Sequence, residues 1–330
     1  MTNATKLLRC VIVLVLFSGG TASHIVRAQD ATFSPTFHGV LQTELGAAIE
    51  AVGDYVRTNP DAPDVEAARR WVLETALEHG LESTALDAAQ LAIESETASQ
   101  PVRALAIQVQ GIGLAKAGRL DEALPVFETH LKSARIRNPT PTVDFGLALV
   151  GEAQLANNPE AAREILERLK DALFLNASVR QLCEDRLLKL QLLGRKAPAV
   201  TATDLAGDPL DLSQFSGKVL LIDFWATNCP PCLEEFPAMK RVYEEHHADG
   251  FETIGITLDE QQSVVDEFQE KWALPWLLAL NGSDKGQTRD RFRVRTIPSL
   301  FLLNRSGEIA YVDVRGDTLR RGVERLLNEE

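Results

Sequence analysis

Cysteine and positive charge are both scarce in this sequence of 330 residues. Four cysteines are too few for a small-core fold that depends on a dense set of disulfides. The net charge of −13 argues against a nucleic-acid-binding protein, because phosphates would be repelled. Apolar residues make up 45% of the chain, so it can fill ordinary hydrophobic cores, and the length favours two domains.

Long hydrophobic runs are also missing near the N-terminus, where a targeting segment is expected. The apolar run Val11–Phe17 follows two basic residues and is too short for a comfortable membrane span. Small residues in the stretch VRA at 26–28 fit a cleavage site, so residues 1–28 are predicted to be a signal peptide of an exported, periplasmic protein. The alternative is an uncleaved membrane anchor. Cleavage would remove three basic residues and no acidic one, which changes the net charge from −13 to −16.

Residues 45–195 are predicted to form an all-α domain, after a flexible leader at residues 29–44 that shows little periodicity. Apolar residues recur at helical spacing in Val65–His79, Leu86–Glu94, Arg103–Ala117 and Leu120–Lys132.

A weak repeat runs through this helical region. The stretch GIGLAKAGRLDEALPVFE, which begins at Gly111, resembles a tetratricopeptide repeat. Ala85 and Ala162 stand in two fainter copies where Ala123 stands in this one. The resemblance implies an array of helical hairpins that could bind a protein partner, and a plain helical bundle is the alternative.

Beyond a boundary at residues 194–200, strands alternate with helices, which predicts an α/β domain over residues 196–330. The stretch KVLLIDFW is apolar on both faces, as expected for a central strand covered by helices on each side. Further elements are predicted at Pro231–His246 (helix), FETIGITL (strand), QQSVVDEFQEKWAL (helix), SLFLLNRSGEIAYVDV (two strands) and TLRRGVERLLNEE (helix).

Cys229 and Cys232 lie two residues apart between that strand and the next helix. A zinc site needs four ligands, and the chain has no second such pair, so we expect no metal. A structural disulfide across two residues would remove little entropy from the unfolded chain. A redox pair fits better, because the start of a helix favours a thiolate and Pro231 suits its first turn. Cys229 is then the nucleophile, and Cys232 is the more buried, resolving cysteine.

Asp223 lies within the apolar strand, on the same face as Leu221 and Trp225. A buried carboxylate either takes up a proton or finds a partner. A raised pKa would let Asp223 relay the proton of Cys232. The alternative is an inert, hydrogen-bonded Asp at a strand end.

The stretch DFWATNCPPC, with TIPS at 296–299, resembles a thioredoxin-fold oxidoreductase, and KVLLIDFWATNCPPCLEEFP resembles the TlpA/ResA branch of exported reductases. The resemblance covers residues 196–330. It implies thiol-disulfide exchange with protein substrates and a membrane thiol carrier as electron donor. No cofactor is expected.

The resemblance also implies residues around the cysteines. Pro298 would be cis and face the disulfide, and Ile297 would pair its backbone with an extended substrate, whereas the sequence alone favours a trans bond. Further candidates for substrate contact are Trp225, Asn228, Pro230 and Pro231. Asn228 stands where this branch usually has Trp, so the substrate groove is predicted to be wetter or differently shaped.

Two other predictions concern single residues. Glu260 aligns with a Glu that approaches the thiols in ResA-like proteins. The local alternative is that Asp259 caps the following helix and Glu260 lies in its first turn. Cys183, in VRQLCEDRLLKL, is predicted to be a packed helix residue rather than a third redox thiol.

The favoured function is an extracytoplasmic thiol-disulfide oxidoreductase that reduces protein disulfides and serves redox homeostasis. A peroxiredoxin-like peroxidase is one alternative, but Thr227 lies two residues before Cys229 where that family has Thr three residues before. A non-catalytic helical-repeat binding protein is the other, and the intact cysteine pair and Asp223 argue against it.

Overall fold

The computed structural model describes residues 35–133, 138–281 and 287–329. The predicted signal peptide lies outside these residues. A single compact unit spans residues 34–330. In the described part of the chain, no helix combines the length and apolar character that a membrane crossing requires.

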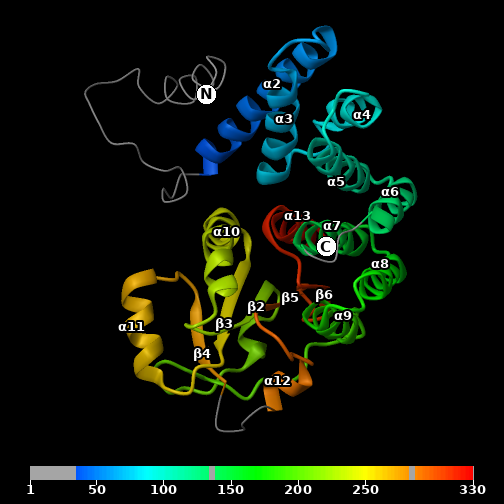
Figure 1. Cartoon of the computed structure of the whole chain (residues 1–330). Coiled ribbons are helices and arrows are strands. Elements are labelled where there is room, and N and C mark those ends of the chain that lie inside the picture. The colour runs from blue at the N-terminus through cyan, green and yellow to red at the C-terminus, as the bar shows by residue number, and fades with distance from the viewer. Residues whose placement is uncertain (1–34, 134–137, 282–286, 330) are drawn as a thin grey trace, which may run out of the picture. The chain divides into compact units, whose positions relative to one another are not determined.

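The first half of the described chain is helical (Figure 1). Its helices are α2 (Pro35–Thr58), α3 (Val65–His79), α4 (Leu86–Glu94), α5 (Gln100–Lys116), α6 (Leu120–Ser133), α7 (Thr140–Leu155), α8 (Pro159–Ala172) and α9 (Ala177–Leu190). The prediction of a flexible leader at residues 29–44 is wrong for residues 35–44, which belong to α2. Leu45, Ile49 and Val56 recur at helical spacing and are buried, which anchors α2.

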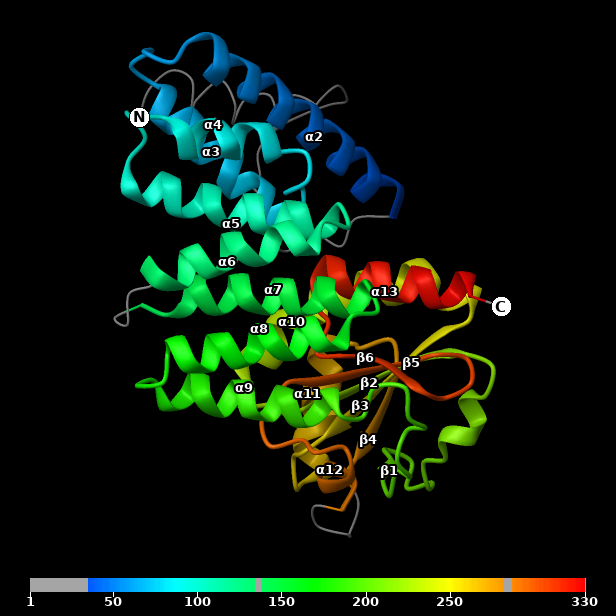
Figure 2. The same cartoon turned by 90° about the vertical axis from the view of Figure 1, so that its right-hand side faces the viewer.

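Helices α5 to α9 stack in chain order, each against the next (Figure 2). The aligned Ala85, Ala123 and Ala162 are all fully buried. At Gly111, a side-chain carbon would lie 2.3 Å from the ring of Phe145, so glycine makes room for this ring of α7. The helical region is thus confirmed, and its tetratricopeptide character stays a prediction.

A six-stranded mixed sheet follows, with the order β1-β4-β3-β2-β5-β6. Its strands are β1 (Thr203–Asp204), β2 (Val219–Trp225), β3 (Phe251–Thr257), β4 (Leu277–Leu280), β5 (Ser299–Leu303) and β6 (Ile309–Val312). The helices of this part are α10 (Pro230–His246), α11 (Gln262–Trp272), α12 (Gln287–Arg291) and α13 (Gly316–Asn328). Strand β2 pairs in parallel with β3 and antiparallel with β5, so the predicted strand KVLLIDFW is central.

The two faces of β2 pack against different helices, because successive side chains of a strand point to opposite sides. Leu221 and Trp225 share a core with α10, α11 and α13, which we call the α10 face. Leu220, Ile222 and Phe224 share a core with α9, which we call the α9 face. We call helices α2 to α9 the helical array. Its last helix, α9, therefore covers one side of the sheet.

Helix α7 also reaches the sheet, at its edge. The side-chain amide of Gln154 donates to the Val312 carbonyl at 3.0 Å and accepts from the Val312 N–H at 2.9 Å. Further along β6, the Gly194 N–H donates to the carbonyl of Ile309 at 2.9 Å. The segment at the predicted domain boundary is thus paired with the sheet, and the two predicted domains share a core.

Candidate active site

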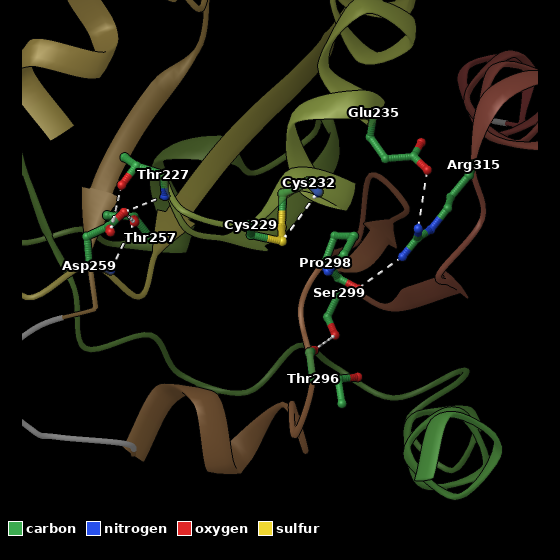
Figure 3. The surroundings of a disulfide bond; sticks show 10 residues. All are labelled: Thr227, Cys229, Cys232, Glu235, Thr257, Asp259, Thr296, Pro298, Ser299 and Arg315. Carbon is green, nitrogen blue, oxygen red and sulfur yellow. Dashed lines mark hydrogen bonds and ion pairs between the residues drawn. A yellow bond between two sulfur atoms is a disulfide. The ribbon is translucent and has the colours of Figure 1, made fainter. Parts of the chain in front are cut away.

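Cys229 caps the N-terminus of α10, where Pro230 and Pro231 occupy the first turn. Its sulfur accepts the N–H of Cys232 at 3.3 Å. The two cysteines form a disulfide with an S–S distance of 2.11 Å (Figure 3). Cys229 is 7% exposed and Cys232 1%. The predicted placement of Cys229 just before the first turn, and the deeper burial of Cys232, are confirmed.

Asp223 lies in β2 and is buried. Burial raises its pKa to about 8; Arg315 acts against this rise, and Glu235 and Asp313 add to it. The Oδ1 atom has no hydrogen-bond partner among the described residues. A raised pKa was the expectation for a proton relay, and the alternative of a hydrogen-bonded, inert carboxylate does not fit this oxygen.

Arg315 links the cysteine-bearing helix to the loop that contains Pro298. Its guanidinium pairs with Glu235 of α10 at 3.2 Å and donates to the Pro298 carbonyl at 3.0 Å. The Ile297–Pro298 bond is cis, as the resemblance implied, and Figure 3 shows Pro298 beside the disulfide. Neither Arg315 nor Glu235 was predicted from sequence, because this contact joins residues 80 positions apart.

A second link holds the turn that leads into the cysteines. The carboxylate of Asp259 accepts from the Thr227 N–H at 2.8 Å and from its hydroxyl at 2.9 Å. The alternative in which Asp259 caps α11 is wrong, since Gln261 occupies the cap position. Glu260 is exposed and precedes that cap, so it does not lie in the first turn. Its approach to the thiols stays a prediction.

Thr227 and Asp259 could have been found from the sequence. They follow β2 and β3, two adjacent parallel strands, and the carboxyl ends of parallel strands meet at one edge of a sheet. The cap position predicted for Asp259 is a local role and does not include this contact with Thr227.

The proposed substrate contact through Trp225 is wrong. Its side chain is fully buried on the α10 face, against Phe236 and Phe268 at centroid distances of 5.2 and 5.0 Å. Gly255 admits it, because a side-chain carbon there would lie 2.8 Å from the indole nitrogen. The other candidates in the motif, Asn228, Pro230 and Pro231, are exposed.

Cys183 is a free, buried cysteine of α9, as predicted. Burial raises the pKa of its thiol to about 11, so it is protonated at neutral pH. Within the described ranges, no group of three or more His, Cys, Asp or Glu residues is placed to hold a metal ion.

Comparisons with known proteins agree with this site. Residues 193–312 match the AhpC/TSA family. The chain is 32% identical over 126 residues to the thiol-disulfide oxidoreductase ResA of Halalkalibacterium halodurans, across 38% of this chain and 70% of that protein. The chain belongs to the ResA-like thiol-disulfide oxidoreductases.

Two other similar proteins carry related names. ResA of Geobacillus kaustophilus is 30% identical over 135 residues, which are 41% of this chain and 76% of that protein. The solution structure of a thiol:disulfide interchange protein from Bacteroides sp. is 29% identical, covers 42% of this chain and 91% of that one, and has a TM-score of 0.39. The family match begins at residue 193, so the helical array lies outside it.

Proposed function

We propose that this oxidoreductase works outside the cytoplasm and reduces protein disulfides through Cys229. The observation that carries the proposal is the position of Cys229 at the start of α10, where its sulfur accepts a backbone N–H. In the reduced protein the same N–H and the positive end of the helix would stabilise a thiolate. The extracytoplasmic location rests on the predicted signal peptide at residues 1–28.

The reaction is an exchange of two electrons. The Cys229 thiolate attacks one sulfur of a substrate disulfide, which breaks that bond and releases a substrate thiolate that takes a proton from water. The ionised form of Asp223, which is about a tenth of the total at pH 7 for a pKa of about 8, then takes the proton of Cys232, and the Cys232 thiolate attacks the Cys229 sulfur. The mixed disulfide breaks, the second substrate thiolate leaves, and the protein ends as the Cys229–Cys232 disulfide.

Asp223 suits this role because it is buried and its pKa is raised to about 8. When a donor reduces the disulfide, the protonated carboxyl returns its proton to the Cys232 thiolate. A membrane thiol carrier is proposed as this donor.

Substrate recognition is proposed at the cis-proline loop and the exposed residues of the motif. The backbone of Ile297 has no hydrogen-bond partner among the described residues, so it is free to pair with an extended peptide. Asn228 adds an exposed polar side chain next to Cys229. A protein partner on the helical array stays a prediction.

The test is reduction of insulin disulfides by dithiothreitol. We expect the wild type to accelerate the reaction and Cys229→Ser to fall to the rate of dithiothreitol alone. Cys183→Ala is the matched control, because it removes a thiol that takes no part, and it should keep the wild-type rate. A Cys229→Ser protein with undiminished activity would contradict the proposal.

Trapping would name the substrate. Cys232→Ser cannot resolve the mixed disulfide, so partners should accumulate on Cys229 and be identified by mass spectrometry. A wild type that consumed peroxide faster than free thiol, and reduced no protein disulfide, would favour the peroxidase instead.

A further inference from the structure

A buried cluster of charges on α9 lies next to the cis-proline loop. Asp185 and Lys189 are almost completely buried, although both come from the helical array. The ammonium of Lys189 pairs with Asp185 at 2.7 Å and with Asp313 at 2.6 Å. Charges of this kind are costly to bury unless each finds partners, so their contacts indicate what they hold in place.

Asp185 holds the N-terminal side of the loop. One carboxylate oxygen accepts the Arg295 N–H at 2.9 Å, and the other accepts the Thr296 hydroxyl at 3.0 Å. These two residues come directly before Ile297, the residue proposed to pair with the substrate backbone. Hydrogen bonds to a charged group are about twice as strong as neutral ones.

Lys189 holds the C-terminal side. Its ammonium donates to the Ser299 hydroxyl at 2.9 Å, and this hydroxyl donates to the Thr296 carbonyl at 2.7 Å. Figure 3 shows Ser299 and Thr296 below Pro298, joined by this second hydrogen bond. The loop is thus fixed on both sides of Ile297 by one helix of the array.

We propose that Asp185 and Lys189 are positioning residues, which hold the cis-proline loop in the shape that pairs with a substrate peptide. We call these two residues the α9 clamp. The proposal rests on the proposed function, since it concerns the same site. A loop that is already ordered loses little conformational freedom when the peptide binds. The protein therefore has a higher affinity for the peptide than it would have with a disordered loop. Without the clamp, that cost would fall on substrate binding, and the chemistry of Cys229 would be unaffected.

The principal variant is the double substitution Asp185→Asn with Lys189→Met, which removes one charge of each sign. We expect the KM for a disulfide-bonded peptide to rise about tenfold, because the loop must be ordered on binding. The kcat should change less than about twofold. The rate at which iodoacetamide alkylates reduced Cys229 should also change less than about twofold, because this reaction does not require a peptide to bind at the loop.

Glu152→Gln is the matched control. Glu152 is a buried carboxylate of the array that pairs with Arg321 of α13 at 2.6 and 2.7 Å, and it does not contact the loop. Its loss should lower stability without raising KM. A KM that rose equally in both variants, or an alkylation rate that fell together with peptide reduction, would overturn the proposal.

Thr296→Val covers the case in which the double variant does not fold. It deletes only the hydroxyl that donates to Asp185, and we expect KM to rise about two- to threefold; an unchanged KM would overturn the proposal. If the wild type reduced no peptide, the proposed function would fail instead. The affinity of the same peptide with serine in place of cysteine would then test the clamp, and equal affinity for wild type and Thr296→Val would refute it.

Discussion

Asp223 and Asp313 are both buried beside the same sheet, yet they reach opposite ionisation states. Asp223 has no ion pair among the described residues, and burial raises its pKa to about 8. Burial alone would raise the pKa of Asp313 too, but Lys189 and Arg186 of α9 outweigh it and lower that pKa. At neutral pH the carboxyl of Asp223 is therefore mostly protonated, whereas that of Asp313, which contacts the array, carries its negative charge.

Removing the array should have the largest effect on this contrast. Residues 196–330 alone would leave Asp313 without its α9 partners and expose Leu220, Ile222 and Phe224 of the α9 face. We expect this fragment to aggregate or to lose cooperative unfolding, while a chain that begins at residue 29 unfolds cooperatively in urea. A monomeric fragment with the midpoint of the longer chain would show that the array is dispensable for folding.

The substitution Asp313→Asn should come next. It leaves the buried Lys189 and Arg186 with too little negative charge, and breaking such a network costs about 3–5 kcal/mol of unfolding free energy. Urea unfolding of the oxidised protein measures this loss of unfolding free energy. Asp223→Asn serves as the comparison, since a neutral amide replaces a carboxyl that is mostly protonated at pH 7, and a cost as large as that of Asp313→Asn would contradict the contrast.

The pH dependence of Asp223 gives a third effect, which is smaller than the second only when it is taken per pH unit. The pKa of Asp223 is about 8 in the folded protein and about 4 in the unfolded chain. Between these two pH values the carboxyl is protonated in the folded protein but ionised in the unfolded chain. Its contribution to stability is complete below pH 4, falls by up to about 1.4 kcal/mol per pH unit as pH rises, and levels off above pH 8. Unfolding curves at several pH values should show Asp223→Asn gaining on the wild type up to pH 8; a constant difference would refute the raised pKa.

The smallest effect is expected at the uncharged contact of the array with the sheet. Gln154→Ala removes two hydrogen bonds to the backbone of Val312, at a cost of about 1–2 kcal/mol in unfolding free energy. Insulin reduction should keep the wild-type rate, because Gln154 contacts neither the cysteines nor the cis-proline loop. A slower reaction would show that the array influences the site by more than the α9 clamp.

Local patterns predicted the elements well, and long-range contacts were missed. The helices Val65–His79 and Leu86–Glu94 are confirmed at both ends, because their apolar spacing is regular. Strand β4 was missed, since Leu277–Leu280 is a short apolar run with no alternation.

In the site, the position of Cys229 and Cys232 at the start of a helix could be predicted because they follow β2 closely, and the burial of Asp223 because it lies inside that strand. The clamp could not be found in the same way. Asp185 and Lys189 are four residues apart on a helix, the spacing of an ordinary exposed ion pair, and only the packing of α9 on the sheet buries them.

The amide of Gln154 has one more consequence. By occupying both backbone groups of Val312, it blocks part of the edge at which another chain could add a strand. The opposite edge strand, β1, is only two residues long. Neither edge therefore offers a long template to which another chain could add a strand, and this limits fibre growth from the sheet.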